Sequence, residues 1–559
     1  MTHRWPLVVA AFACALGLLA ARAEAAPAPL SPVANALAEG DPLAFAAGTV
    51  PRLERSAAFG HSGALYARSP GGAVETARRV AQWRPQIERA VAGSGFSADV
   101  LEGIVFLESA GRADAIAPGS VNSASGLVQI MGYTANDFLG MNVKVHQSRA
   151  LTNRINVAKA RGQHARARRL EAQRRRIDAR FDPPKALAAA VRYLKTARGY
   201  LGRNDLAVAS YHMGIGNMQS VVRAYAGKAD ADVAYARIFF DSGPDRNAAA
   251  WEKLLSLGDD SRHYYFKVLA AKRIMHLYRT NPAELAAVAR LHARKHSHEE
   301  VMHPSSRTRV FDGAREIAAA REGAELLPVP NRPDELHFEI SPGMGSLAPK
   351  LGVKKTTYRA LRPEALAALT YLAQRVQQVG GTKTPLILTS TVRDWGYQRR
   401  LMRVNTMAAR SYSIHTTGYA FDIARAWNSR RQAAAVQFVL DRMVAHGLIA
   451  YIKEPHAIHV AVSRDAEMLI PAMLGARASE ADPAPEVEVD PPLPAKPLAP
   501  ELREEAHVVR GRSAAEPPAE ATQAAAAAAK PRVAETPAEP KRGFLEQLRD
   551  FLGVWTPTP

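Results

Sequence analysis

The chain has 559 residues and a formal net charge of +20, and 47 % of its residues are hydrophobic. This length exceeds that of one ordinary domain and predicts three or four units, most of which can bury a core. The basic charge favours a polyanionic partner, and composition leaves nucleic acid, anionic membrane and acidic cell wall open.

Residues 1–25 are typical of a secretory signal peptide. A basic start at 1–4 precedes an apolar run at 7–20, and a small-residue cleavage site ends at Ala25. Cys14, the single cysteine, lies in this segment, so the mature chain is expected to contain no disulfide. No later apolar run is long enough for a transmembrane helix. The sequence therefore predicts a periplasmic or secreted protein, for which nucleic acid is a poor partner and the wall polymer a good one.

The first half of the mature chain is expected to be mainly helical. Residues 26–75 are rich in Ala, Pro, Gly and Ser and are predicted to form a linker with little core of its own. Apolar residues at helical spacing then predict a helical domain over 76–228 and a helical extension over 229–294. Within the domain, residues 149–180 are dense in Arg, Ala and Gln and predict an exposed basic helical insert. The insert is either a solvated charged surface or a contact for an anionic wall polymer.

A carboxyl group at Glu108 ends the apolar run 104–107. Burial against such neighbours raises the pKa of a carboxyl group and keeps it protonated, as a general acid requires. Alone, Glu108 would fit a purely structural glutamate better. Two further motifs follow it in order: Ser-Gly-Leu-Val-Gln-Ile-Met at 125–131 and Ala-Val-Ala-Ser-Tyr-His-Met-Gly-Ile-Gly-Asn at 207–217.

Together with Glu108-Ser109, these motifs resemble the soluble lytic transglycosylases, which have an all-α lysozyme-like fold. The resemblance covers about residues 78–225 and implies peptidoglycan as the substrate, with Glu108 as the catalytic acid and then base. It also implies substrate-binding roles for Ser125, Gln129, Tyr211 and Asn217. The sequence departs from the family at His212, where Asn is usual, and at the start of the helix after Asp182.

The resemblance also bears on the glycan chemistry. No second carboxylate is placed to act as nucleophile or base, so the two-carboxylate scheme of most glycosidases does not fit. The family instead uses the substrate's own N-acetyl group or 6-hydroxyl. This implies cleavage between muramic acid and glucosamine with a 1,6-anhydro product.

The second half of the chain begins with a polar stretch. Residues 295–335 contain His296, His298 and His303 and are predicted to form a linker, because nothing in the sequence orders these histidines into a metal site. Mixed helix and strand patterns then predict an α+β domain over 336–473, in which 336–340 is a structural strand. Its other predicted elements are helices at 363–379, from 398 onward and at 431–446, and strands at 385–390, near 450 and at 458–462.

Two histidines and a carboxylate in this domain form a candidate zinc site. His415 and Asp422 lie seven residues apart, and the segment Glu-Pro-His-Ala-Ile-His at 454–459 follows later in the chain. A catalytic zinc has three protein ligands and a fourth position open to water. Arg393, after the strand at 385–390, is the candidate cation for a developing oxyanion.

This set resembles the zinc D-alanyl-D-alanine carboxypeptidases and related endopeptidases, a group that also includes hedgehog domains. The resemblance covers about residues 384–463 and implies a zinc ion held by His415, Asp422 and His459. His456 remains an alternative to His459 as third ligand, and the base is Glu454 with His456 in reserve. Ser413 and Gln398 would position ligands or substrate. A metal-free fold that only binds peptide is the competing interpretation.

The C-terminal residues differ again in composition. Residues 474–542 are dominated by Pro, Ala and Glu and are predicted to be disordered. Residues 543–555 carry apolar side chains at helical spacing and predict a short amphipathic helix that docks on a partner or a membrane surface, or else frays.

The leading hypothesis is an exported bifunctional peptidoglycan hydrolase. An all-α lysozyme-like domain would cleave the glycan, and an α+β hedgehog-type zinc domain would cleave stem peptides at a D-alanine-containing bond. The alternative is a wall-binding or scaffolding protein with one or both sites inactive. Carboxypeptidase and endopeptidase activity stay open, as do housekeeping and toxin roles.

Overall fold

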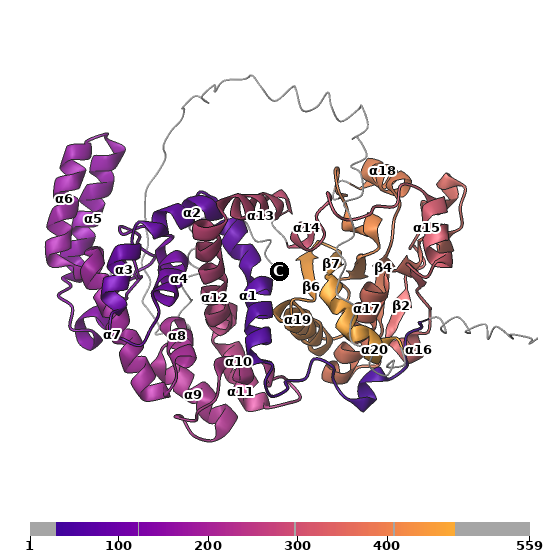
Figure 1. Ribbon diagram of the computed structural model, residues 1–559, viewed down its shortest axis with the longest axis horizontal. Coiled ribbons are helices and arrows are strands. Elements are labelled where there is room, and N and C mark those ends of the chain that lie inside the picture. The colour runs from indigo at the N-terminus through magenta and orange to yellow at the C-terminus, as the bar shows by residue number, and fades with distance from the viewer. Residues whose placement is uncertain (1–29, 121, 296–297, 406–407, 476–559) are drawn as a thin grey trace, which may run out of the picture.

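The structure is a computed structural model that describes residues 30–475, with gaps at 121, 296–297 and 406–407. The predicted signal peptide, Pro/Ala/Glu-rich tail and amphipathic helix lie outside the described residues. Within the described part, no helix is both long and apolar enough to cross a membrane. Figure 1 shows a helical domain beside a mixed domain that contains the sheet.

The helical domain buries two adjoining hydrophobic cores, and α12 contributes to both: Ala270 and Ile274 to one, Phe266 and Val268 to the other. The predicted helical extension over 229–294 is therefore part of the domain rather than an appendage to it. The helices of this domain are α1 (Val50–Arg68), α2 (Gly72–Ala81), α3 (Arg84–Val91), α4 (Ala98–Ser109), α5 (Val145–Ala160), α6 (His164–Ile177), α7 (Pro183–Leu201), α8 (Asn204–Met213), α9 (Ile215–Ala226), α10 (Tyr235–Phe240), α11 (Ala248–Ser256), α12 (Gly258–Thr280) and α13 (Pro282–Lys295).

The mixed domain is built on a five-stranded sheet in the order β2-β4-β5-β7-β6. The β2–β4 pair is parallel and the remaining pairs are antiparallel. The long helices α17 and α19 pack together, and their apolar side chains share one core with the sheet. The elements of this domain are α14 (Glu299–Met302), α15 (Ala314–Glu322), β1 (Leu327–Pro328), α16 (Pro333–Leu336), β2 (Phe338–Ile340), β3 (Ala360–Leu361), α17 (Pro363–Gly380), β4 (Leu386–Ser390), α18 (Trp395–Val404), β5 (Ala420–Ala424), α19 (Arg430–Ala445), β6 (Ile449–Lys453), β7 (Ala457–Val462) and α20 (Ile470–Met473).

Helix α1 contradicts the predicted linker over 26–75. It packs between α12 and α19, and so joins the two domains (Figure 1). A Cβ atom at Gly60 would lie 2.0 Å from the carbonyl oxygen of Val444 in α19. The small residues that made this segment look like a linker are therefore those that let two helix backbones approach closely.

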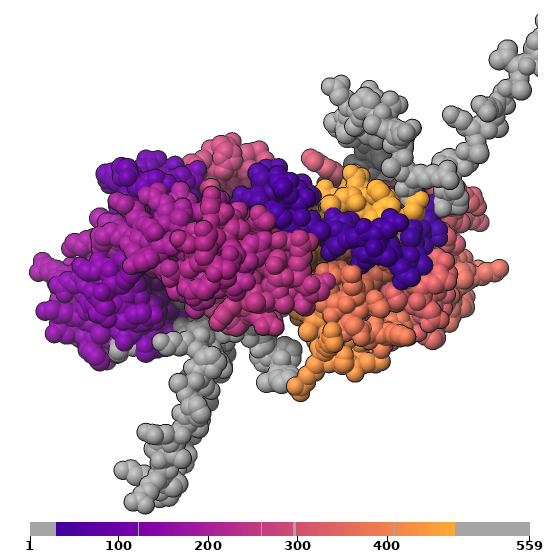
Figure 2. Space-filling view, turned by 90° about the horizontal axis from the view of Figure 1, so that it is seen from below, coloured from indigo at the N-terminus to yellow at the C-terminus, as the bar shows by residue number. Residues whose placement is uncertain are grey.

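The residues before α1 are also packed. Val33 donates its backbone N–H to the Met473 carbonyl at 2.9 Å and accepts a hydrogen bond from Gln374 at 2.8 Å. Figure 2 shows this indigo segment lying across the yellow and orange surface of the mixed domain. The N-terminal residues thus cover part of the mixed domain, the C-terminal of the two domains.

The basic insert forms the helical hairpin α5–α6, which projects at the edge of the helical domain (Figure 1). It has a small core of its own, made of Leu151, Ile155, Ala158, Ala167 and Leu170. Its base is fixed by a buried ion pair of 2.8 Å between Arg180 and Asp178. Most of its arginines remain exposed to solvent.

The predicted linker over 295–335 is also wrong, because this segment folds against both domains. Gly63 of α1 donates its backbone N–H to His298 Nε2 at 2.7 Å, and His303 Nε2 hydrogen-bonds the Val462 carbonyl at 2.6 Å. Phe311 is fully buried. His298 and His303, two of the polar residues that suggested a solvated linker, are thus hydrogen-bonded inside the fold. His296 lies outside the described residues.

Candidate active sites

The first site is centred on Glu108, in the last turn of α4. Ser97 caps the start of this helix by accepting the Val100 N–H, and the buried Leu101, Ile104 and Val105 anchor it in the core. Glu108 is only 7 % exposed. This burial raises its pKa from 4.5 to about 7, against a smaller lowering by a hydrogen bond from Tyr264. Glu108 therefore titrates near neutral pH, where a large fraction of it carries the proton that a general acid needs.

Tyr264 is a direct partner of Glu108 that the motifs missed. Its hydroxyl donates to Glu108 Oε1 at 2.6 Å from α12, 156 residues further along the chain. Its ring is stacked on those of Tyr211, at 6.3 Å between centroids, and His212, at 5.3 Å. Tyr211 in turn donates its hydroxyl to the Val128 carbonyl at 2.9 Å. The three sequence motifs thus converge on one carboxyl group through Tyr264, which carried no motif signal of its own.

The other predicted substrate-binding residues of this site each donate a side-chain hydrogen bond to a nearby backbone carbonyl. Ser125 is 4 % exposed and donates to the Ser123 carbonyl at 3.0 Å, so it shapes its loop, and its predicted substrate contact stays a prediction. Gln129 has a positive φ of 48° and donates its amide to the Gly126 carbonyl at 2.7 Å. Asn217 is exposed in the first turn of α9, where its amide donates to the Met213 carbonyl.

The second site brings His415, Asp422 and His459 together. His415 lies on a 3₁₀ turn (Ile414–Thr417), while Asp422 on β5 and His459 on β7 are direct partners in the antiparallel ladder. Asp422 Oδ1 lies 3.0 Å from His415 Nε2 and 2.9 Å from His459 Nδ1, and those two nitrogens are 3.1 Å apart. His456 lies outside this group.

The outer nitrogens of both histidines have acceptors. His415 Nδ1 lies 2.8 Å from the Thr391 carbonyl, and His459 Nε2 lies 2.8 Å from Glu299 Oε2. A neutral imidazole has one N–H, so each inner nitrogen presents a lone pair to the other and to Asp422. Three acceptor atoms that face one another in this way can hold a cation between them, and tetrahedral zinc ligands lie about 3.3 Å apart. The residues therefore fit a zinc ion.

The pKa values of the three residues also show that the cluster attracts positive charge. Burial lowers the pKa of His415 to about 4, whereas hydrogen bonds with Asp422 and Glu299 outweigh burial at His459 and raise its pKa to about 9. Although burial alone would raise it, the pKa of Asp422 is held well below its ordinary value, chiefly by His415 and His459. In the metal-free protein, the cluster thus retains a proton on His459 beside an ionised carboxylate.

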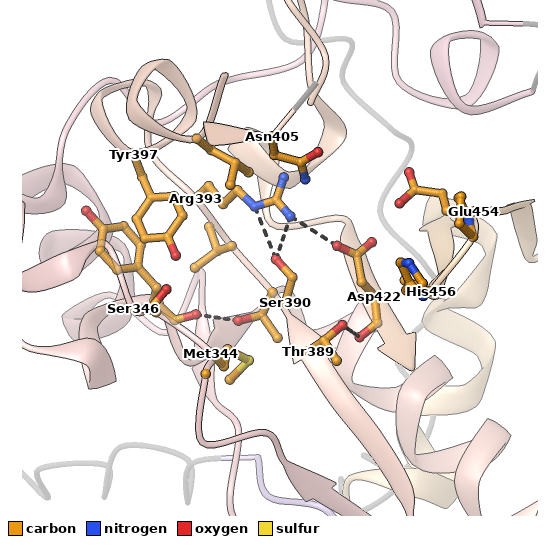
Figure 3. Close-up of a pocket in the computed structure, with 18 residues that line it drawn as sticks. Met344, Ser346, Thr389, Ser390, Arg393, Tyr397, Asn405, Asp422, Glu454 and His456 are labelled. Carbon is orange, nitrogen blue, oxygen red and sulfur yellow. Dashed lines mark hydrogen bonds and ion pairs between the residues drawn. The ribbon is translucent and has the colours of Figure 1, made fainter. Parts of the chain in front are cut away.

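Arg393 connects the cluster to the adjoining pocket. Its guanidinium donates to Ser390 Oγ at 2.8 Å and to Asp422 Oδ2 at 3.0 Å, as Figure 3 shows, and to Gln398 Oε1 at 3.3 Å. A guanidinium has five N–H groups, and Nε also bonds Ser390, so within the described residues one N–H of Nη1 is left for a ligand. Arg393 can thus orient a metal ligand and still face a substrate oxygen.

The pocket in front of Asp422 has a volume of about 350 Å³. Glu454 and His456 line it beside Asp422, and Met344, Ser346 and Tyr397 line the opposite part (Figure 3). Burial, followed by the charge of Asp422, raises the pKa of Glu454. A half-buried carboxylate in this position can take up a proton, as the predicted base must.

Gln398 and Ser413 do not reach this pocket. Gln398 is fully buried between Arg393 and the Ala409 carbonyl, and Ser413 is 4 % exposed at the start of the 3₁₀ turn that carries His415. That the two residues position ligands or substrate stays a prediction. Gln398 accepts a hydrogen bond from Arg393 at 3.3 Å, and the Ser413 carbonyl accepts the backbone N–H of Thr416, in the turn that carries His415, at 2.9 Å.

Comparison with known proteins addresses the first site. Residues 160–233 match the transglycosylase SLT domain. The matched segment contains Tyr211, His212 and Asn217, begins downstream of Glu108 and ends before the metal cluster. The comparison with curated proteins finds no match to the chain. The SLT match supports a peptidoglycan lytic transglycosylase function for the helical domain.

Proposed function

We propose that the protein is an exported bifunctional peptidoglycan hydrolase, a lytic transglycosylase in its helical domain and a zinc-dependent D,D-peptidase in its mixed domain. The buried, protonated Glu108 beside Tyr264, within a chain that matches the SLT domain, carries the glycan half. The three inward-facing ligand atoms of His415, Asp422 and His459 carry the peptide half. Peptidoglycan offers both bonds in one polymer, in the periplasm or outside the cell.

In the glycan reaction, Glu108 acts alone. Its proton passes to the glycosidic oxygen between muramic acid and glucosamine, and that C–O bond breaks. The 6-hydroxyl oxygen of the muramic acid then closes on the anomeric carbon and gives its proton to the Glu108 carboxylate. The product is a 1,6-anhydro sugar, no water is consumed, and Glu108 ends in its starting state. Within the described residues, its pKa shift has two causes, burial and Tyr264, and neither is a second carboxylate.

In the peptide reaction, His415, Asp422 and His459 would hold the zinc ion. When bound, zinc lowers the pKa of a water molecule and polarises the substrate carbonyl. Glu454 would act as the base, taking up a proton on its carboxylate and passing it to the leaving amine. The remaining N–H of Arg393 is placed to stabilise the negative charge that develops on the carbonyl oxygen.

Product analysis from intact peptidoglycan tests the glycan half. We expect the mature protein to release anhydro-muropeptides, detected by mass spectrometry, and Glu108→Gln to lower the rate about 10²- to 10⁴-fold, the usual contribution of a general acid. Unchanged anhydro release by Glu108→Gln would refute the role of Glu108. Glu252→Gln, at an exposed position on α11, is the matched control.

Metal analysis tests the peptide half on the same samples. We expect about one zinc per chain, and loss of peptide-cleaved muropeptides with a chelator while anhydro products continue. A protein that binds no zinc, or that cleaves peptide equally with chelator, would refute the metallopeptidase. A protein that binds peptidoglycan but releases neither product would instead support the wall-binding alternative.

A further inference from the structure

Glu299, the first residue of α14, is a buried carboxylate against the candidate metal centre. It is 2 % exposed, and its Oε2 lies 2.8 Å from His459 Nε2. It belongs to the segment that the sequence predicted to be a linker, 160 residues away from His459 in the chain. Burial of a carboxylate is costly unless it is paired, so this contact calls for an explanation.

The contact determines which nitrogen of His459 can bind a metal. A neutral imidazole has one N–H, and the hydrogen bond to Glu299 places it on Nε2. The lone pair is then on Nδ1, the atom that faces His415 Nε2 at 3.1 Å and Asp422 Oδ1 at 2.9 Å. Without an acceptor at Glu299, the proton is free to occupy Nδ1, where it would exclude a cation.

The two histidine ligands are held by different acceptors. His415 donates to the neutral Thr391 carbonyl, whereas His459 faces the carboxylate of Glu299 on α14. Helix α14 is the first helix of the mixed domain and belongs to the segment 295–335, the connecting segment, which contacts both domains. A carboxylate acceptor makes the imidazole a more basic ligand and also fixes its ring orientation.

The segment that carries Glu299 is fastened to both domains. On one side, His298 accepts the backbone N–H of Gly63 in α1 at 2.7 Å, and its ring lies 5.1 Å from that of Phe59. On the other side, the His303 ring stacks on Tyr419 at 4.0 Å, and its Nε2 bonds the Val462 carbonyl. Glu299 lies between these attachments, so its position depends on both domains.

We infer that Glu299 is a positioning residue for the metal centre: from the connecting segment, it holds His459 with the Nδ1 lone pair toward His415 and Asp422. This inference rests on the proposed metal site. The role of Glu299 is to act on a ligand, and the residue itself touches neither metal nor substrate. The second domain would then complete its metal centre with a residue held against the first.

The test is zinc affinity, measured on the full mature chain by competition with a chromophoric chelator. We expect Glu299→Ala to weaken zinc binding about 10- to 100-fold, the range found for partners of metal-bound histidines. Glu299→Gln keeps the size and an acceptor oxygen without the charge, and we expect a weakening between wild type and Glu299→Ala. Glu300→Gln is the matched control, because Glu300 is the neighbouring residue, is equally buried and pairs with Arg294.

Three results separate the possibilities. Wild-type affinity in both Glu299 variants would overturn the inference and leave the zinc site intact. An equal loss in Glu300→Gln would also overturn it, because α14 would then act only as structural support. Absence of zinc binding by the wild type would overturn the metal site itself. Nitrogen-15 spectra of the histidine rings in the zinc-loaded protein provide a second readout, in which we expect the single ring proton of His459 on Nε2 in the wild type and redistributed in Glu299→Ala.

Discussion

The two candidate sites control a proton in opposite ways. At Glu108, burial among Tyr264, Tyr211 and His212 raises the pKa of a single carboxyl group, and the active form is the neutral one. At the metal cluster, fixed partners hold charged and lone-pair-bearing atoms in place, with Thr391 behind His415 and Glu299 behind His459. The first site depends on burial, which keeps water and charge away from Glu108. The second depends on hydrogen bonds that fix the positions of charged and lone-pair-bearing atoms. Substitutions should therefore act on the first site through pH and on the second through affinity.

Apart from the rate effect of Glu108→Gln, the largest difference should come from Arg393→Met. We expect peptide cleavage to fall about 10²- to 10³-fold, the effect of losing one oxyanion donor, with anhydro-sugar release unchanged. The two rates are measured separately on intact sacculi, with zinc content determined because Arg393 also pairs with Asp422. Arg399→Met, on the exposed side of α18, is the control. Equal loss of both activities would show that the sites are not independent.

Glu108→Gln should change the pH dependence of stability. The pKa of Glu108 is about 7 in the folded chain and 4.5 ordinarily, so its contribution is complete below 4.5 and is lost as pH rises through 7. Complete loss amounts to about 3 kcal/mol at 1.36 kcal/mol per pKa unit. We expect Glu108→Gln to be more stable than wild type above pH 7, measured by urea unfolding between pH 5 and 8. A parallel decline in both proteins would contradict the raised pKa.

Tyr264→Phe should have a smaller effect, of about tenfold on the rate of anhydro release. The hydrogen bond from Tyr264 lowers the pKa of Glu108, so its removal should move the alkaline limb of the pH–rate profile upward while the rate falls. The control is Tyr265→Phe, the neighbouring residue, whose hydroxyl bonds Glu54 instead. A slower enzyme with an unshifted profile would limit Tyr264 to packing.

We expect the smallest effect from Gly63→Ala, a substitution in the helical domain that tests whether this domain influences zinc affinity in the mixed domain. At Gly63, a Cβ atom would lie 2.5 Å from His298 Nε2, so Gly63→Ala should displace the segment that carries Glu299. We expect zinc affinity to fall a few-fold, within the range of mutational coupling between sites. Gly199→Ala, on a helix with no atom within 4 Å of the new methyl group, is the control. Unchanged affinity in Gly63→Ala would show that the metal centre is insensitive to this attachment.

The sequence predicted the parts of each site that lie in local motifs. The spacing of His415 and Asp422 and the apolar run around His459 indicated elements that the structure brings together, and the predicted strands at 385–390 and 458–462 agree with β4 and β7. These strands could be predicted because the pattern of apolar residues depends on which side chains of a single element are buried.

No comparable pattern in the sequence indicated Tyr264 or Glu299. Each acts on a residue more than 150 positions away, and each lies in a segment whose local pattern fits a surface helix or a linker equally well. Helix α1 was missed for a related reason, since Gly60 and Gly63 lower its hydrophobicity yet allow close packing. A local sequence pattern does not indicate which distant segment will supply the hydrogen-bonding partner of a site residue.

The position of α1 has a consequence for the order in which the chain folds. Its helix is synthesised early, but the surfaces that bury it, on α12 and α19, are completed only after residues 258–280 and 430–445. The contact between Val33 and Gln374 spans 341 residues. Closing such long loops slows folding, because their entropy is lost before the contacts form. We therefore expect the N-terminal segment to dock late and to set the rate at which both domains reach their final form.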